Sequence, residues 1–381
     1  MNLDELRLEI DNIDDKLIEL ISQRMDVSAK IGEYKQKNNL PVHQPQRERE
    51  KLNSVTDKTR DDLKEYMRIL YSSVFDVSRA YQAKLNAKKT ELYNIIENSV
   101  KNTPQLFPQS ATVACQGVEG AYSQIACERI FKMPHIMYVN NFEGVFSAID
   151  KGLCDYGVIP IENSTAGSVK QVYDLMISHN FNIVKSVRIK IDHNLLVKKG
   201  TKAEDIKEIF SHEQAINQCA EYLKKFPNAK ITCCENTAVA SRMVAESERC
   251  DVAALSSHSC ADIYGLVCLE NSVQDKGNNH TRFICISKKP EIYPGADRTS
   301  IMMILPHKPG SLYKALAKFN ALGIDLIKLE SRPIPDRDFE FMFYFDFQTS
   351  VYSDEFVELI CSLDDICEDY KYLGSYTEVV R

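Results

Sequence analysis

The spacing of apolar residues divides the chain into regions with different expected structures. From Leu3 to Tyr34, apolar side chains recur at alternating intervals of three and four residues, which is typical of a long helix with a coiled-coil seam. A seam of this length requires a partner helix. Residues 1–90 contain a single glycine, so this region is predicted to be all-helical. Residues 91–110 include two prolines near their end and are expected to form a helix tail followed by a linker.

Residues 111–288 alternate short β-rich runs with helical runs, and this alternation predicts a mostly parallel sheet with helices on both faces. The expected strands are Ala111–Ala114, Ile136–Val139, Gly157–Ile161, Ile183–Ile191, Ile231–Cys234, Val252–Leu255 and Phe283–Ile286. Residues 299–376 read strand, helix, strand, strand, helix, strand, which is the βαββαβ order of ferredoxin-like α+β domains. A chain of 381 residues exceeds one ordinary hydrophobic core, so a multi-domain protein is expected.

The composition, with 44% hydrophobic and 27% charged residues, is typical of a soluble globular protein. The net charge of −7 argues against nucleic acid and anionic membranes as partners, so an anionic ligand must be held by local Arg and Lys residues. Neither a secretory signal nor a membrane-spanning apolar run is recognised, and a cytoplasmic location is expected. The twelve cysteines do not pair with His at zinc-ligand spacing, so buried reduced thiols and no metal site are predicted.

Arg24 occupies a seam position of the first helix where Leu or Ile would pack best. It is either a snorkelling or register-setting arginine, or part of an anion site inside a helical bundle. Lys35 lies about 20° around the helix and about 16 Å along its axis, so both cationic groups can reach one small dianion. Arg7 lies about 25 Å before Arg24 on the same axis. Arg7 can therefore serve such a site only in a neighbouring chain, and a homodimer is expected.

A second helix is expected to begin near Arg47 and Glu48, and Ser78 and Gln82 lie one turn apart on a later helix. These residues contain no nucleophile–base pair and no metal-ligand set. They suit the binding of a dicarboxylate and the electrostatic stabilisation of a pericyclic reaction. In the spacing of Arg7, Arg24, Lys35, Arg47, Glu48, Ser78 and Gln82, residues 3–86 resemble the all-helical chorismate mutases.

This resemblance implies roles for individual side chains. The arginines are expected to hold the two carboxylates of chorismate, and Lys35 and Gln82 to stabilise the breaking ether oxygen. Glu48 is expected to contact the substrate hydroxyl. Gln44 departs from the family, in which many members carry Asp at this position; an amide can still donate and accept hydrogen bonds.

Three polar segments adjoin predicted strands: Glu162–Ser168, Ser211–Gln214 and Gly277–Phe283. Each has an ordinary structural interpretation, as an N-cap box, a hydrogen-bonding histidine and a turn. Together they place polar side chains at several strand ends of one α/β domain, where ligands bind in open sheets. A helix that begins there also offers backbone N–H groups to an anion. Thr281 adds a hydroxyl proton beside Arg282, a possible carboxylate anchor.

Five motifs in this region resemble prephenate dehydratase, from Ala111 to about Ser287. They are Gln116-Gly117-x-x-Gly120-Ala121-Tyr122-Ser123, Pro160-Ile161-Glu162-Asn163-Ser164, Ser211-His212-x-Gln214, Glu235-x-Thr237-Ala238 and Thr281-Arg282-Phe283. The resemblance implies a fold of two α/β lobes around a cleft, similar to periplasmic binding proteins. It also implies loss of the ring hydroxyl and carbon dioxide from prephenate to give phenylpyruvate, without a cofactor.

By the same resemblance, Thr281 is expected to donate the proton to the departing hydroxyl. The substrate is expected to contact Asn163, Ser164, Thr165, Ser211, His212, Gln214, Thr237, Thr281, Arg282 and Phe283. Two residues depart from the family pattern. Glu213 replaces a common Pro after the histidine, and Asn236 replaces a common Ser before Thr237. Glu213 adds a carboxylate near an anionic substrate and is expected to weaken its binding.

The C-terminal region carries two short segments that resemble the amino-acid-binding signatures of ACT regulatory domains. They comprise Gly310, Ser311 and Leu312, and Glu330, Ser331, Arg332 and Pro333. Gly310 is expected to allow close backbone approach at a strand-to-helix turn. The resemblance implies that phenylalanine binds between two such domains and inhibits the enzyme as an end product.

The motifs taken together predict a bifunctional chorismate mutase/prephenate dehydratase with an ACT domain, at least dimeric. The expected domains are residues 1–90, a linker over 91–110, 111–288 and 299–376. Two alternatives stay open. One is a monofunctional dehydratase whose helical region only dimerises, and the other is a non-enzymatic two-lobed sensor of a small molecule.

Overall fold

The structure is a computed structural model that describes residues 2–38, 40, 44–85, 90–334 and 340–380. Its residues form two compact units. The first holds Met1–Ile95, Ile304–Leu326 and Tyr352–Tyr370, and the second holds Ile96–Met303, Ile327–Val351 and Lys371–Arg381. Within the described ranges, no helix combines the length and the apolar character needed to cross a membrane.

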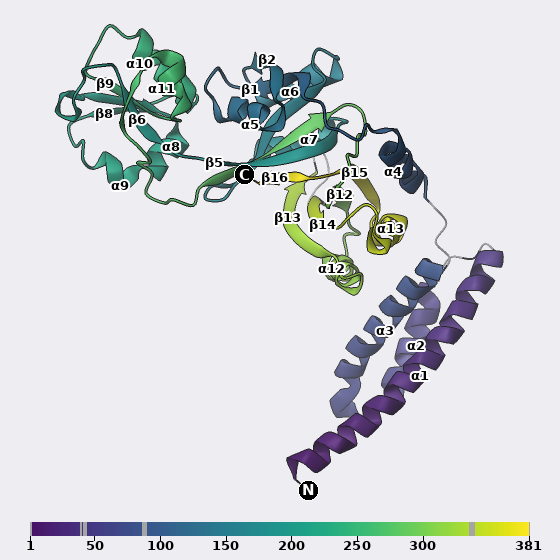
Figure 1. Cartoon of the computed structure of the whole chain (residues 1–381). Coiled ribbons are helices and arrows are strands. Elements are labelled where there is room, and N and C mark those ends of the chain that lie inside the picture. The colour runs from purple at the N-terminus through teal and green to yellow at the C-terminus, as the bar shows by residue number, and fades with distance from the viewer. Residues whose placement is uncertain (1, 39, 41–43, 86–89, 335–339, 381) are drawn as a thin grey trace. The chain divides into compact units, whose positions relative to one another are not determined.

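The N-terminal region is helical, as predicted. Its elements are α1 (Leu3–Lys37), α2 (Pro45–Asp57), a 3₁₀ turn (Asp61–Leu63) and α3 (Lys64–Leu85). Figure 1 shows α1, α2 and α3 lying along one another, with α1 the longest. In the expected linker, α4 (Glu91–Asn102) forms a separate helix before the first strand.

The apolar seam of α1 is uncovered in the single chain. Its apolar residues are 40–64% exposed: Leu3, Leu6, Ile10, Ile13, Leu17, Leu20, Val27, Ile31 and Tyr34. Soluble monomers rarely expose a continuous apolar stripe of this length. The coiled-coil pattern therefore corresponds to a surface that no described residue of the same chain covers.

The second unit contains three sheets among the described residues. The first lobe has the order β16-β5-β11-β3-β1-β2, with β4 paired to β3. Its strands are β1 (Ser110–Gln116), β2 (Met133–Val139), β3 (Tyr156–Asn163), β4 (Gly167–Ser168), β5 (Asn182–Lys190), β11 (His280–Ser287) and β16 (Glu378–Val380). Its helices are α5 (Tyr122–Ile130), α6 (Phe142–Asp150) and α7 (Lys170–Ser178).

The second lobe has the strand order β10-β6-β9-β7-β8. These strands are β6 (Asn194–Val197), β7 (Glu208–Ser211), β8 (Lys230–Cys233), β9 (Val252–Ser256) and β10 (Val267–Glu270). Its helical elements are a 3₁₀ turn (Ala203–Asp205), α8 (Glu213–Gln218), α9 (Ala220–Leu223), α10 (Thr237–Glu246) and α11 (Ser259–Tyr264). The expectation of two α/β lobes is thereby confirmed.

The prediction of one mostly parallel sheet is wrong, because both lobes are mixed. β1 pairs in parallel with β2 and β3, but β11 pairs antiparallel with both β3 and β5. The chain leaves the first lobe after β5 and returns to it as β11, so these neighbouring strands must run in opposite directions (Figure 1). The local hydrophobic pattern does not indicate that the chain returns from the second lobe to the first.

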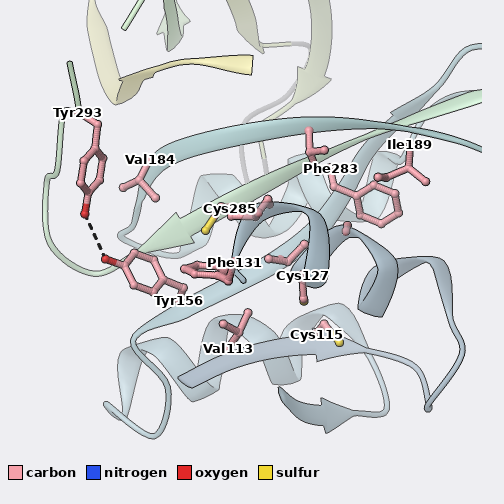
Figure 2. Packing of buried hydrophobic residues seen from close by; sticks show 14 of the residues in the cluster. Val113, Cys115, Cys127, Phe131, Tyr156, Val184, Ile189, Phe283, Cys285 and Tyr293 are labelled. Atoms are coloured by element: carbon pink, nitrogen blue, oxygen red, sulfur yellow. Dashed lines mark hydrogen bonds between the residues drawn. The ribbon is translucent and has the colours of Figure 1, made fainter. Parts of the chain in front are cut away.

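The core of the first lobe lies between its sheet and α5. It includes Val113, Cys127, Phe131, Val187 and Cys285. Figure 2 shows Phe131 beside Tyr156, whose hydroxyl lies 3.4 Å from that of Tyr293. All twelve cysteines of the chain are free thiols. The expected burial of Cys127, Cys219 and Cys285 is confirmed, since each has no exposed surface.

The C-terminal region follows the predicted order of elements. They are β12 (Arg298–Ile304), α12 (Ser311–Ala321), β13 (Asp325–Pro333), β14 (Phe341–Gln348), α13 (Asp354–Cys361), α14 (Leu363–Ile366) and β15 (Asp369–Tyr376). The strands form a four-stranded sheet, called here the C-terminal sheet, in the order β13-β14-β12-β15.

Gly310 has a different role from the one expected. Its backbone φ of 84° lies in the left-handed region, and no described atom lies within 4 Å of the position a Cβ would occupy. The glycine is therefore required for the conformation of the turn before α12, and not for close approach within the chain.

Candidate functional site

The helical region brings Arg24 of α1 to Ser78 of α3. The Arg24 Nη1 donates a hydrogen bond to Ser78 Oγ, and the guanidinium lies 5.9 Å from the centre of the Phe75 ring. Ser78 is 6% exposed, and its hydroxyl donates to the Val74 carbonyl at 2.6 Å. Arg24 is thus turned towards the neighbouring helix, which agrees with a binding site between the helices rather than with a snorkelling side chain.

Lys35 lies about three turns after Arg24 on α1 and is 9% exposed. Burial lowers the pKa of Lys35; the carboxylate of Glu48 acts in the opposite direction, and Arg79 lowers the pKa further. Glu48 itself accepts a hydrogen bond from Arg79 Nη1. A buried ammonium beside an arginine is stabilised by an added anion, because the anion offsets both the desolvation and the like charge.

Gln82 contributes a buried amide with one group unsatisfied. Its Nε2 donates to Ser28 Oγ at 2.7 Å, while Oε1 has no hydrogen-bond partner among the described residues. Since the two ends of an amide are exchanged by a 180° rotation, Ser28 can equally donate to the oxygen and leave Nε2 unpaired. Either way, a buried polar group of Gln82 remains for a ligand.

Of the remaining expected mutase residues, Arg7 and Arg47 are exposed and Gln44 is half-buried. Arg7 contacts Asp4 at 3.4 Å, and Arg47 contacts Glu50 at 3.5 Å, all with largely exposed side chains. Gln44 is the N-cap residue of α2 but makes no side-chain cap. Arg7 and Arg24 are separated by about 25 Å of helix, so this chain alone does not unite them.

In the first lobe, the paired strands β3 and β11 place Asn163 opposite Thr281. The Asn163 Nδ2 donates to Thr281 Oγ1 at 2.9 Å, and both residues are 9% exposed. Thr281 was expected in a polar segment before a strand, but β11 already begins at His280. The hydroxyl hydrogen of Thr281 finds no acceptor among the described residues and can donate to a ligand.

Asn163 also fixes the polar loop that follows β3. Its Oδ1 accepts hydrogen bonds from the backbone of Thr165 at 3.0 Å and of Ala166 at 2.9 Å, and from the Thr165 hydroxyl at 2.7 Å. Ser164 Oγ donates to the Asn278 carbonyl at 3.0 Å. The structure therefore brings Asn163, Ser164, Thr165 and Thr281 together as predicted from the sequence.

Gln218 and Asn279 complete this network and were not among the expected site residues. Asn163 Nδ2 donates to Asn279 Oδ1 at 2.7 Å, and Asn279 Nδ2 donates to Gln218 Oε1 at 2.8 Å. Gln218, from the second lobe, donates to Thr165 Oγ1 at 3.1 Å. Its oxygen also accepts from His193 Nε2 at 2.9 Å, and burial lowers the pKa of His193. The signals in the sequence were the position of Gln218, one helical turn after Gln214, and that of Asn279 inside the polar segment Gly277–Phe283.

A cleft of about 180 Å³ adjoins this network. It is lined by Thr165, Asn217, Gln218, Asp275, Lys276 and Asn279, which come from both lobes and from the segment returning to β11. The Asp275 carboxylate accepts hydrogen bonds from the backbone N–H groups of Glu221 and Tyr222, so its charge caps α9. Lys276 is exposed and has no ion-pair partner among the described residues.

Three residues expected to contact the substrate are buried and have partners within the protein. Arg282 is 3% exposed, and its guanidinium is paired with Glu162, at 2.7 Å from Nε to Oε1, and with Asp346. The Nε contact is an ion pair whose angle is too poor for a hydrogen bond. Phe283 is 2% exposed and packs in the core of the first lobe (Figure 2). Ser211 is fully buried, and its hydroxyl donates to the Leu255 carbonyl at 2.8 Å.

The other expected residues of the second lobe lie at the N-termini of α8 and α10. His212 is the N-cap of α8, and its Nδ1 accepts from the Gln214 backbone at 3.2 Å; the Gln214 side chain is exposed. Thr237 begins α10 after Asn236, whose side chain accepts from the Val239 backbone at 2.8 Å. Asn is as good an N-cap as Ser, so this departure from the family pattern is neutral for the helix. Glu213 is exposed in the first turn of α8.

In the C-terminal region, two of the expected effector residues contact the first lobe. Ser168 Oγ donates to Glu330 Oε2 at 2.6 Å. The Arg332 guanidinium donates to both oxygens of Asp174, at 2.8 and 2.9 Å. Ser331 and Pro333 are exposed. Ser311 and Leu312 are half-buried in the first turn of α12.

The chain thus has cationic and amide side chains gathered on α1 and α3, and a cleft lined by polar residues of two α/β lobes. Residues 6–83 match the family of chorismate mutase type II, and residues 113–291 match the prephenate dehydratase family. The bifunctional chorismate mutase/prephenate dehydratase of Escherichia coli strain K12 is 30% identical over 381 residues, which cover 97% of this chain and 95% of that protein.

Two solved structures share the fold over 70% of this chain. The prephenate dehydratase of Arthrobacter aurescens, in complex with L-Phe, is 25% identical with a TM-score of 0.64, and 90% of it is covered. GqqA, described as a novel type of quorum quenching acylase, is 26% identical with a TM-score of 0.65, and 98% of it is covered. The chain belongs to the family of bifunctional chorismate mutase/prephenate dehydratases.

Proposed function

We propose that the chain catalyses two consecutive reactions of phenylalanine biosynthesis. Its helical region rearranges chorismate to prephenate, and its two-lobed region converts prephenate to phenylpyruvate. The observation that carries the second step is the hydrogen bond from Asn163 to Thr281 beside a polar cleft. The first step is supported by Arg24, Lys35 and Gln82, which place cationic and amide groups between α1, α2 and α3.

The mutase reaction is a pericyclic rearrangement in which a C–O bond breaks while a C–C bond forms, with no proton transfer. The protein therefore needs only to hold the dianion in a reactive conformation and to stabilise negative charge on the ether oxygen. Arg24 is assigned to a carboxylate, and Lys35 and Gln82 to the ether oxygen. Lys35 suits this role, because the negative charge on the ether oxygen offsets the free-energy cost of its buried ammonium group.

In the dehydratase reaction, the C–CO₂ bond breaks and its electron pair enters the ring as the hydroxyl leaves with a proton. Carbon dioxide, water and the aromatic phenylpyruvate are the products. Thr281 is assigned to the departing hydroxyl, because its own hydrogen is unpaired within the described structure. The threonine hydroxyl is a weak acid, and the hydrogen bond from Asn163 to its oxygen stabilises the negative charge that develops as the proton moves.

The substrate carboxylates need a cation that Arg282 does not supply, since its charge is engaged by Glu162 and Asp346. Lys276 lines the cleft with Thr165 and Asn279. A flexible ammonium at the rim of a polar cleft can pair with a carboxylate without a desolvation cost in the free enzyme. We assign Lys276 to a carboxylate of prephenate.

The exposed seam of α1 supports a homodimer or a higher homo-oligomer in which a second copy covers it. In that arrangement Arg7 of one copy completes the mutase site of the other. Phenylalanine is proposed as an allosteric inhibitor that binds the C-terminal region, supported by the L-Phe complex of the Arthrobacter aurescens relative. A cytoplasmic location is proposed from the free thiols.

An assay with the full chain distinguishes this function from its alternatives. We expect purified protein to consume chorismate and, separately, to form phenylpyruvate from added prephenate. Phenylpyruvate formation without chorismate consumption would identify a monofunctional dehydratase. Loss of both reactions, together with ligand binding in calorimetry, would identify a small-molecule sensor.

A further inference from the structure

The C-terminal sheet contacts the strands that carry the dehydratase residues through two side chains of β13. Lys328 Nζ donates to Ser168 Oγ at 2.8 Å and lies 2.9 Å from Glu162 Oε2. Ser168 in turn donates its hydroxyl hydrogen to Glu330 Oε2 at 2.6 Å. Lys328 and Glu330 are two residues apart and so lie on one face of β13. Ser168 is thus held from both sides by the C-terminal sheet.

These contacts lie directly behind the catalytic pair. Glu162 faces Ser168 across β3 and β4 and faces Arg282 across β3 and β11. The next step of the same ladder pairs Asn163 with Thr281. Since successive residues of a strand point to opposite faces, the row Ser168, Glu162 and Arg282 lies on one face and the pair Asn163 and Thr281 on the other. A shift of the first row therefore moves the second.

Lys328 is needed to balance charge in the first row. Burial opposes ionisation of Glu162, but Arg282 and Lys328 outweigh it and hold the pKa of the carboxyl below its usual value. Arg282 divides its charge between Glu162 and Asp346, and Asp346 is 1% exposed. Lys328 and Glu162 are partly buried, with side chains 19% and 27% exposed, beside the buried pair of Arg282 and Asp346. Removing the ammonium group of Lys328 from this cluster leaves an excess of negative charge, which destabilises it. Without Lys328, the short hairpin from β3 to β4 must rearrange.

We propose that Lys328 is a positioning residue of the dehydratase site, and that Ser168 is the contact through which the C-terminal sheet controls that site. The inference rests on the proposed dehydratase activity. Lys328 fixes the hairpin that carries Asn163, and Asn163 orients Thr281. Glu330 contributes to the same control through its hydrogen bond with the Ser168 hydroxyl. An amino-acid effector whose ammonium group binds the Glu330 carboxylate displaces the Ser168 hydroxyl, which loosens the same hairpin.

Steady-state kinetics of Lys328→Met test the positioning role, because methionine keeps the length of the side chain and removes its charge. We expect kcat for phenylpyruvate formation to fall about tenfold while KM changes less than about twofold, since misplacement of a catalytic group lowers turnover more than binding. Lys328→Arg should recover most of kcat. Lys170→Met, at an exposed lysine beside the hairpin, is the matched control. Wild-type kcat in Lys328→Met would overturn the proposal.

The role of Ser168 is tested with Ser168→Ala, which keeps the ion pair of Lys328 and Glu162 but removes the hydrogen bonds of the Ser168 hydroxyl to Lys328 and Glu330. Calorimetry should show that phenylalanine still binds. Its maximal inhibition of the dehydratase should weaken at least about fivefold, which is the lower range of allosteric coupling. Inhibition equal to that of the wild type, with equal binding, would overturn the role of Ser168.

Hydrogen exchange of the backbone over residues 162–168 separates this proposal from the dehydratase assignment. Exchange in this segment should be faster in Lys328→Met than in the wild type, and unchanged in Lys170→Met. If the wild type forms no phenylpyruvate, the proposed function fails and the exchange comparison alone decides the contact. Equal exchange in both variants would show that Lys328 does not hold the hairpin.

Discussion

Asn163 and Thr281 face each other across β3 and β11, and the amide of Asn163 donates to the Thr281 hydroxyl oxygen at 2.9 Å. The same Asn163 side chain accepts three hydrogen bonds from the loop that follows it, from Thr165 and Ala166. One residue thus couples the conformation of the polar loop to the orientation of the catalytic hydroxyl. The predictions for the dehydratase follow from this arrangement.

Replacement of Thr281 by alanine should abolish most of the dehydratase activity and leave the mutase intact. The hydroxyl is the proton donor for the departing group, and general acid catalysis typically contributes about 10²–10⁴-fold. We expect phenylpyruvate formation from prephenate to fall by this factor, whereas chorismate consumption by the same preparation is unchanged. The two activities of one sample provide the control for folding.

Asn163→Asp is the matched variant for this test. Aspartate keeps the acceptor oxygen that organises Thr165 and Ala166, but it cannot donate to Thr281 when ionised. The dehydratase kcat should fall while the loop stays ordered in hydrogen exchange. An Asn163→Asp enzyme with wild-type kcat would show that the hydrogen bond to Thr281 has no part in catalysis.

Lys276→Met should weaken binding of prephenate without impairing turnover of the bound substrate. A charged hydrogen bond to a carboxylate contributes enough to raise KM about tenfold when it is lost. Lys224→Met, at a lysine of the second lobe that is paired with Glu221 at 2.7 Å, is the control. Unchanged KM in Lys276→Met would place the carboxylate anchor elsewhere.

The mutase should lose activity at alkaline pH through Lys35. Only the ammonium form stabilises the ether oxygen, and burial lowers the pKa of Lys35 below its usual 10.5. We therefore expect kcat/KM of the mutase to fall as the pH rises through the pKa of Lys35, which lies below 10.5. In Lys35→Arg, whose charge persists to higher pH, this limb should move upwards or disappear. A profile that is identical in both enzymes would exclude Lys35 as the titrating group.

Hybrid dimers test whether Arg7 serves the partner subunit. Arg7→Ala and Arg24→Ala should each be inactive as mutases, but subunits exchanged by co-refolding should form heterodimers with one intact site. Because half of the dimers in an equal mixture are mixed and half of their sites are intact, about a quarter of the wild-type activity is expected. Verified heterodimers without any recovered activity would contradict a shared site.

The helical region was predictable because its signals are local. The seam of α1 repeats at helical spacing, and the position of Arg24 within it suggested an inward-facing charge, which its contact with Ser78 bears out. The start of β11 was not predictable in this way. Thr281 pairs with Asn163, and Arg282 contacts Asp346, which is 64 residues away in the sequence. The strand therefore lacks apolar alternation at its beginning.

The omitted site residue Gln218 shows the same limit. It reaches Thr165, 53 residues away, only because the two lobes of the second unit meet at the cleft. The short strands β6, β10 and β16 were also not predicted, since three or four residues carry too little pattern to separate a strand from other apolar runs. Pairing with distant neighbours, rather than local sequence, decides their conformation.

The most direct test of the central claim is product analysis after chorismate is added to the intact chain alone. Phenylpyruvate should accumulate, with prephenate as a transient intermediate, and in Thr281→Ala the reaction should stop at prephenate. Chorismate that remains unchanged, or wild-type protein that accumulates prephenate without further conversion, would contradict the assignment of two catalytic activities to one polypeptide.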